Sequence, residues 1–355
     1  MLNGKRTNGH RPTGLLHLLD PSLKLAPHPK QENLSFDLNT ALDSVVRLEA
    51  EIPEDAFSAK TLGQEREGNA VLISEDGILL TIGYLVVDAR LITIKAFGRE
   101  PISAEVVGYN HETGLAIIHA LDKLPISPIK LGSAANLNEQ DPVIIAPYGG
   151  EHHSISGKVV SRRDFAGSWE YLLENAIFTS PIHPNWSGAA LINDEGALCG
   201  IGSLWVNDAD QPKEPNITNI AGSGSSDELK NIPGNMFVPI DLLKPIYNDL
   251  ISFGMVSGDQ RPWIGMYTSE TMNQLFVSGI IPGAPADLAD IEPGDMVIAI
   301  NHQEVTNLIE MYKLIWSLGS AGSEITFNLR RDDKYLEITV KSDSRYNFME
   351  KRKKH

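Results

Sequence analysis

Short alternating runs of apolar and polar residues dominate positions 68–206, and they predict many β-strands separated by turns. Residues 70–73 and 78–81 flank Ser-Glu-Asp-Gly at 74–77, which is typical of a β-hairpin. Further strands are predicted at 91–97, 104–109, 115–120, 142–146, 154–161, 176–179, 188–192 and 198–204. Strands of this length and spacing favour a barrel or sandwich over a parallel α/β sheet.

On both sides of these strands the pattern of apolar and polar residues changes. Residues 37–51 predict a short helix or turn leading into a strand, and residues 239–253 carry apolar positions at helical spacing, with Asp241 near the start and Gly254 as the stop. After a linker at 257–261 come strands at 263–267, 276–280, 296–300, 324–330 and 334–340, and helices at 284–290 and 307–318. This mixture predicts a second, compact β-rich domain.

Polar segments separate these regions. Residues 1–36 are rich in Pro, Gly, Asn and Lys and predict an extension, and residues 207–233 predict a long exposed loop insertion. The predicted organisation is an extension at 1–36, a first domain at 37–256, a second domain at 260–342 and a basic tail at 343–355.

Composition narrows the choice of function. With 355 residues, 42 % hydrophobic and 21 % charged, the chain is long enough for two globular domains with cores of their own. Its net charge of −16 argues against nucleic acid as a partner, because phosphates require clustered Lys and Arg. No membrane span is visible, and the apolar stretch at 15–19 is too short for a signal peptide, so a cytoplasmic protein is expected.

The first candidate for a catalytic site is the segment 179–188, T-S-P-I-H-P-N-W-S-G, which is followed by an apolar strand. This run resembles the nucleophile loop of trypsin-like serine proteases, usually written G-N-S-G-G-P-L. Ser187, Gly188 and Leu191 match that pattern, whereas Asn185 stands where the first glycine is expected.

Motifs on both sides of this loop resemble the HtrA/DegP family, in which a trypsin-like protease domain precedes a PDZ domain. G-N-A-V-L-I-S-E-D-G-I-L-L-T, A-E-V-V-G-Y-N-H-E-T-G-L-A-I-I and N-M-F-V-P-I-D-L-L-K-P-I are similar to protease-domain signatures of the family. P-W-I-G-M, I-I-P-G-A-P-A-D-L-A and I-E-P-G-D-M-V-I-A-I-N resemble PDZ motifs. The resemblance covers residues 37–341 and implies a mainly β protein, a trypsin-like double β-barrel followed by a PDZ domain.

The resemblance also implies a catalytic triad, of which only the serine remains. The histidine position falls on Tyr84 or Leu85, depending on the alignment, and the aspartate position falls on Gly114. A tyrosine with a pKa of about 10 is ionised to roughly one part in a thousand at pH 7. Loss of the base alone costs on the order of 10⁶ in turnover in a well-studied serine protease. Asn185 alters the oxyanion turn, so a pseudoprotease is expected.

Other histidines provide an alternative base. His183 lies four residues before Ser187, His111 is near the lost aspartate position, and His152-His153 follow Glu151 in a glycine-flanked turn. Each fits a loop histidine better, and no second ligand cluster supports a metal site, so neither metal nor cofactor is expected. Trp186 is expected to plug the former substrate cleft. The competing hypothesis is an active serine endopeptidase in protein quality control, with Ser187 and an unconventional base.

The second domain implies recognition of peptide C-termini. In PDZ domains, a loop before the first strand presents N–H groups to the peptide carboxylate, and the peptide adds a strand to the sheet edge. The residues expected to bind the peptide are Trp263, Ile264, Gly265 and Met266 in that loop, and Ile309 and Tyr312 on the following helix. The alternative is that these residues pack the domain core. The expected function is a protein-binding, scaffold or assembly subunit in a homo-oligomer or hetero-complex, although family members are commonly periplasmic.

Overall fold

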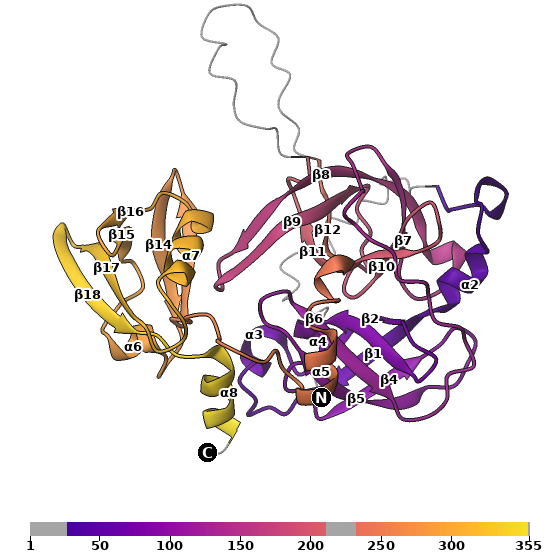
Figure 1. The fold of residues 1–355 in the computed structure, drawn as a ribbon, viewed down its shortest axis with the longest axis horizontal. Coiled ribbons are helices and arrows are strands. Elements are labelled where there is room, and N and C mark those ends of the chain that lie inside the picture. The colour runs from indigo at the N-terminus through magenta and orange to yellow at the C-terminus, as the bar shows by residue number, and fades with distance from the viewer. Residues whose placement is uncertain (1–26, 211–231, 354–355) are drawn as a thin grey trace, which may run out of the picture. The chain divides into compact units, whose positions relative to one another are not determined.

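The computed structural model describes residues 27–210 and 232–353, and its contacts separate two compact units. Unit 1 comprises Met1–Arg163 and Asn175–Val256, and unit 2 comprises Asp164–Glu174 and Ser257–His355. Both units are built mainly from antiparallel strands (Figure 1), so the predicted mainly β fold is confirmed. Parts of the predicted extension (1–26), insertion (211–231) and tail (354–355) lie outside the described residues.

The first half of unit 1 is a closed six-stranded barrel in which each strand pairs with its neighbours in antiparallel fashion. Around the barrel the order is β1 (Val45–Glu51), β2 (Glu65–Leu72), β3 (Ile78–Ile82), β6 (Leu115–Ala120), β5 (Ile102–Tyr109) and β4 (Leu91–Lys95). Inward-facing residues such as Val46, Leu48 and Ile94 have no exposed surface. The alternation seen in the sequence therefore corresponds to the two faces of the barrel wall.

A second closed barrel completes unit 1. Its strands, in order around the barrel, are β10 (Ala190–Ile192), β11 (Leu198–Val206), β12 (Gly234–Pro239), β9 (Tyr171–Ser180), β8 (Ile155–Gly167) and β7 (Pro142–Ala146). Val143, Ile145, Ile177 and Phe237 are among the buried residues of its core. Strands β8 and β9 are longer than the sequence predicted, and their tip belongs to unit 2.

Short helices connect these strands: η1 (Gln31–Asn33), α2 (Leu38–Asp43), α3 (Ala59–Leu62), α4 (Gly83–Val86), η2 (Glu151–His153), η3 (Ile240–Leu242) and α5 (Tyr247–Phe253). The prediction of one continuous helix at 239–253 is wrong, because Pro245 has no N–H to donate and separates η3 from α5. Gly254 does end α5, at a φ of 74°. Asp241 accepts hydrogen bonds from the Ser133 hydroxyl and the Ala134 N–H at 2.5 and 2.6 Å instead of capping a helix.

Unit 2 is a twisted antiparallel sheet covered by helices. The sheet order is β13 (Met266–Thr271), β14 (Gln274–Ile280), β15 (Met296–Ile300), β17 (Glu324–Arg331) and β18 (Lys334–Lys341), with β16 (Gln303–Glu304) paired to β15. The helices are α6 (Pro285–Leu288), α7 (Leu308–Ser317) and α8 (Arg345–Lys353). Met311, Tyr312 and Ile315 of α7 pack into a core with Val277 and Phe327 of the sheet.

The predicted basic tail is largely a helix. Within α8, Phe348 is 7 % exposed, and its ring centroid lies 4.8 Å from that of Trp263. The apolar positions Phe348 and Met349 explain why this segment packs despite its basic residues. At the other end of the chain, Pro27 accepts a hydrogen bond from the Ser156 N–H at 2.9 Å, so the described part of the extension lies against the second barrel.

Candidate active site and peptide-binding groove

Tyr84, and not Leu85, lies beside the candidate nucleophile. Tyr84 belongs to α4, which directly follows β3, and its hydroxyl is 2.9 Å from Ser187 Oγ and 2.6 Å from the carbonyl oxygen of Ser203. Leu85 has no exposed surface and packs against the backbone at Gly68. One of the two positions compatible with the sequence therefore faces the serine, and the other belongs to the core.

The hydrogen bonds of Tyr84 have a defined direction. A carbonyl oxygen only accepts, so the phenol donates to Ser203 and the Ser187 hydroxyl donates to the phenol oxygen. Burial raises the pKa of Tyr84 above its ordinary value, while the adjacent Ser187 hydroxyl and Trp186 indole act in the opposite direction. Tyr84 therefore keeps its proton at neutral pH. A neutral phenol oxygen is a very weak base for the serine proton.

Ser187 is also inaccessible to solvent. Ser187 is 0 % exposed, and the adjacent Trp186 is 4 % exposed. The Ser187 carbonyl accepts hydrogen bonds from the backbone N–H and side-chain amide of Asn69 at 2.8 and 2.9 Å. Gly188 follows with a φ of 73°, and a side chain there would collide with the Asn69 carbonyl oxygen. A substrate carbonyl can reach Ser187 only after this loop has moved.

The oxyanion turn donates its hydrogen bond to an imidazole. The Asn185 N–H donates to His183 Nδ1 at 3.0 Å, and His183 Nε2 lies 2.8 Å from the carbonyl oxygen of His153. Because that carbonyl can only accept, the His183 proton is on Nε2 and Nδ1 is the acceptor. Burial lowers the pKa of His183 to about 4, so the ring is neutral at pH 7. Both ring nitrogens are engaged away from Ser187, so His183 does not act as its base.

Gly114, the predicted position of the missing aspartate, lies close to α4. The Gly114 carbonyl accepts a hydrogen bond from the Gly83 N–H at 2.7 Å, and Gly114 adopts a φ of 79°. A glycine supplies no carboxylate to orient a base. His111 of the same loop packs edge-on against Tyr109, with ring centroids 4.6 Å apart, and exposed His152 lies 6.1 Å from the His28 ring.

Arg66 of β2 is the residue that sequence reasoning missed. The residue is 1 % exposed, and its guanidinium donates to the carbonyls of Tyr84 and Val87 at 2.8 and 2.9 Å and to the Ser58 hydroxyl at 2.7 Å. Burial lowers the pKa of Arg66 to about 10, and the charge of Asp88 acts in the opposite direction. A cation at the C-terminal carbonyls of a helix is favourable, so Arg66 fixes α4 and the direction of Tyr84. The available signal was an arginine at an inward-facing strand position.

The predicted carboxylate-binding loop of unit 2 contacts a carboxylate. The N–H groups of Ile264, Gly265 and Met266 donate to the side chain of Glu170 at 2.9, 2.6 and 3.0 Å. Gly265 has a φ of 80°, and a side chain there would collide with Ala284. These three residues therefore form an anion-binding turn that requires glycine at its centre.

The other residues predicted to bind the peptide lie outside this anion-binding turn and pack against other parts of unit 2. Trp263 donates its N–H to the Asp343 carbonyl at 2.9 Å and packs its ring on Phe348, so it does not belong to the anion-binding turn. Tyr312 is 1 % exposed, and its hydroxyl donates to the Gly167 carbonyl at 2.8 Å. Ile309 is partly buried against the core.

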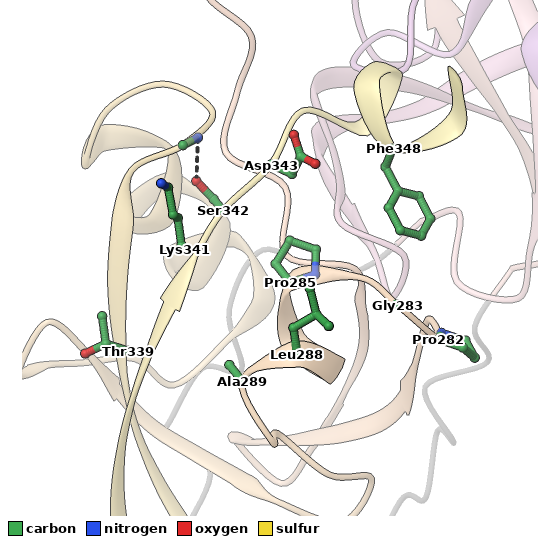
Figure 2. Close-up of a pocket in the computed structure, with 11 residues that line it drawn as sticks. Pro282, Gly283, Pro285, Leu288, Ala289, Thr339, Lys341, Ser342, Asp343 and Phe348 are labelled. Carbon is green, nitrogen blue, oxygen red and sulfur yellow. Dashed lines mark hydrogen bonds between the residues drawn. The ribbon is translucent and has the colours of Figure 1, made fainter. Parts of the chain in front are cut away.

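A pocket of about 850 Å³ lies on unit 2. Figure 2 shows residues that line it. Pro285 and Leu288 of α6, Thr339 and Lys341 of β18 and Phe348 of α8 are among its lining residues. Across residues 27–210 and 232–353, no three His, Cys, Asp or Glu side chains are grouped to hold a metal ion. Among the helices that the structure describes, none has the length and apolarity needed to cross a membrane.

Comparisons with known proteins agree with this architecture. Residues 68–201 match the trypsin-like peptidase domain model, and residues 262–342 match the PDZ domain model, which supports peptide binding. A probable periplasmic serine endoprotease DegP-like of Hahella chejuensis is 24% identical over 287 residues, which cover 77% of this chain and 56% of that protein. The serine protease Do-like HtrA of Bacillus subtilis is 20% identical over 354 residues, which cover 89% and 73%.

Solved structures share the fold. The HtrA-type protease AlgW with decapeptide aligns with a TM-score of 0.50 and 19% identity over 87% of this chain and 99% of that one. The chain spans about half the length of several curated relatives that it matches, including the Hahella protein. Relatives from Hahella chejuensis, Chlamydia muridarum and Pseudomonas putida are named probable periplasmic endoproteases. Those names contradict the expectation of a cytoplasmic protein.

Proposed function

We propose that this chain, an HtrA-family protein with a trypsin-like peptidase domain and a PDZ domain, is a pseudoprotease that acts as a protein-binding, scaffold or assembly subunit. The observation that carries the proposal is the contact of Ser187 with a partly buried, protonated Tyr84 instead of an imidazole. Three further features point the same way: a buried serine, an oxyanion N–H directed at His183, and Gly114 in place of the aspartate.

Binding would be the function of unit 2. The PDZ domain supports recognition of peptide C-termini, and the N–H groups of residues 264–266 suit a carboxylate. Partners of this kind would include protein C-termini, in a homo-oligomer or in a hetero-complex with active relatives. The periplasmic names of several relatives support a location outside the cytosol.

The second candidate function is an active serine endoprotease. Two observations favour it: curated relatives are named probable serine proteases or endoproteases, and the Tyr84 hydroxyl lies within hydrogen-bond distance of Ser187. A tyrosinate is a strong enough base to accept the serine proton. This mechanism requires ionisation of a phenol whose pKa is raised, so its turnover would increase steeply towards alkaline pH.

A labelling experiment separates the two candidates. The full chain would be incubated with an unfolded protein substrate and a serine-directed fluorophosphonate probe at neutral and alkaline pH. We expect no Ser187-dependent labelling or cleavage, because loss of the base alone costs on the order of 10⁶ in turnover.

The matched variants are Ser187→Ala, Tyr84→Phe and Ser203→Ala, the last of which preserves the backbone carbonyl that accepts from Tyr84. Labelling that disappears in Ser187→Ala and persists in Ser203→Ala would overturn the pseudoprotease proposal. A further loss in Tyr84→Phe would identify Tyr84 as the base.

A further inference from the structure

The tip of the β8–β9 hairpin belongs structurally to unit 2. Residues 164–174 pack with the PDZ domain, and Leu172 is 6 % exposed within its hydrophobic core. The Ser168 carbonyl accepts a hydrogen bond from the Thr268 N–H of β13 at 2.9 Å, and the Gly167 carbonyl accepts one from the Tyr312 hydroxyl of α7 at 2.8 Å. The hairpin therefore contacts both β13 and α7, the two elements that border the predicted peptide groove.

Glu170 supplies the anion at the end of this groove. Its residue surface is 9 % exposed, and its two carboxylate oxygens accept the three N–H groups of residues 264–266. Burial raises the pKa of Glu170, while the three N–H donors and the charge of Arg345 act in the opposite direction. In PDZ recognition such N–H groups receive the terminal carboxylate of a peptide. Here a side chain of the same polypeptide occupies that position.

Glu170 adopts a backbone conformation that is unfavourable for a residue with a Cβ. Glu170 has a φ of 56°, in the left-handed region. The last position of a three-residue hairpin loop is usually glycine in that conformation, because a Cβ is unfavourable there. A glutamate is therefore a poor choice for the turn alone, and its contacts with residues 264–266 compensate for the unfavourable backbone. Lys313 of α7 adds an ion pair with Asp164 of the hairpin, with Nζ and Oδ2 2.9 Å apart.

We propose that residues 164–174 are an internal ligand of the PDZ groove, held by Glu170, and that a peptide C-terminus binds this protein by displacing them. The second half of this inference rests on the proposed peptide-binding function. A tethered ligand competes at an effective concentration of the order of millimolar. The apparent affinity for an external peptide is reduced by the fraction of molecules in which the groove is open.

The first test measures whether Glu170 holds the hairpin in place. Amide hydrogen exchange of Ile264, Gly265, Met266 and Thr268 would be followed in the full chain for wild type, Glu170→Gly and Glu170→Gln. Glu170→Gly also relieves the left-handed backbone, so it guards against a variant that fails to fold. Unchanged exchange in the sheet pairing of β17 and β18 verifies that the domain stays folded.

We expect exchange at these four amides to accelerate at least about tenfold in both Glu170 variants, because their hydrogen-bond acceptors leave with the hairpin. The matched control is Glu174→Gln, which changes a carboxylate of the same hairpin. Its side chain is 71 % exposed, and its ion pair with Lys313 is long, at 3.8 Å, so it contributes little. This variant is expected to behave like wild type. Unaltered exchange in the Glu170 variants would overturn the internal-ligand proposal.

The second test measures competition. Synthetic decapeptides with an apolar last residue and a free carboxylate, each paired with its C-terminal amide, would be titrated into the same proteins. Glu170→Gly is expected to bind the carboxylate peptides at least about tenfold more tightly than wild type, which corresponds to a groove that is closed at least about nine-tenths of the time. The amidated peptides are expected not to bind.

Equal affinity in wild type and Glu170→Gly would overturn the displacement proposal. Faster exchange in the Glu170 variants without binding of any peptide has a different meaning. It would support the hairpin as the internal ligand and reject the peptide-binding function proposed for unit 2. The two tests thus distinguish failure of the inference from failure of the function on which it rests.

Discussion

A histidine base accepts a proton from the nucleophile on one nitrogen and donates to an orienting carboxylate from the other. Tyr84 has one oxygen for both roles, and its only proton is directed to the Ser203 carbonyl. That hydrogen bond stabilises the neutral phenol and so opposes ionisation. The sequence predicted which triad positions are replaced, but it could not distinguish Tyr84 from Leu85. Which of these two adjacent side chains faces Ser187 depends on how Arg66 fixes α4.

His183 predicts a pH dependence of stability. Its pKa is about 4 in the folded protein and about 6.5 in an unfolded chain, so the unfolded state takes up the proton first as the pH falls. The contribution of His183 to stability is therefore complete above pH 6.5 and is lost as the pH falls towards 4. The loss amounts to about 3 kcal/mol for a shift of this size.

Denaturant unfolding of wild type and His183→Gln between pH 7 and pH 4 measures this contribution. The variant should lack this part of the pH dependence. His152→Gln replaces an exposed imidazole nearby and should retain the wild-type profile. Parallel profiles for wild type and His183→Gln would contradict a neutral, buried His183.

The β8–β9 hairpin is the element whose boundaries were predicted least accurately from the sequence. Its strands were predicted to end at 161 and to resume at 176, whereas β8 continues to Gly167 and β9 begins at Tyr171. The run S-R-R-D-F-A-G-S-W-E lacks a regular alternation of apolar and polar residues. Its partners explain this, because the hairpin packs against α7, which lies about 140 residues further along the chain. The alternation of apolar and polar residues along a segment does not predict contacts with residues so far away in the sequence.

Tyr312→Phe should weaken the packing of the β8–β9 hairpin against α7. The Tyr312 hydroxyl donates to the Gly167 carbonyl and accepts from the Glu170 N–H at 3.3 Å, so its removal leaves two buried backbone groups without a partner. We expect the free energy of hairpin opening to fall by about 1–3 kcal/mol. Hydrogen exchange at the Thr268 amide measures it.

Tyr335→Phe removes the same hydroxyl from a residue that is 79 % exposed and should leave exchange at Thr268 unchanged. If Tyr312→Phe also left it unchanged, the contact between α7 and the hairpin would not contribute to docking.

At the scale of the whole molecule, the excess of acidic over basic residues argues against nucleic acid as a partner. The net charge of −16 repels polyanions, and the exception is the basic run at 351–354.

We therefore predict that the full chain binds duplex DNA more weakly than about 10⁻⁴ M at physiological salt. Fluorescence anisotropy of a labelled duplex measures this. A variant lacking residues 351–355 is the matched control and should give the same result. Salt-dependent binding that disappears with this truncation would show that the basic run is a binding site.

The sequence by itself determined the strand-rich pattern and the two domain types and predicted the replacement of two triad positions, because these follow from local periodicity and from motifs that occupy adjacent positions. Only the tertiary structure determined which polar groups form hydrogen bonds with one another. It directed the Tyr84 proton to Ser203, engaged both nitrogens of His183, and brought the Glu170 carboxylate to N–H groups that lie about 95 residues further along the chain. Such contacts depend on the closure of barrels and sheets and on the exclusion of water, and neither is encoded in any single segment.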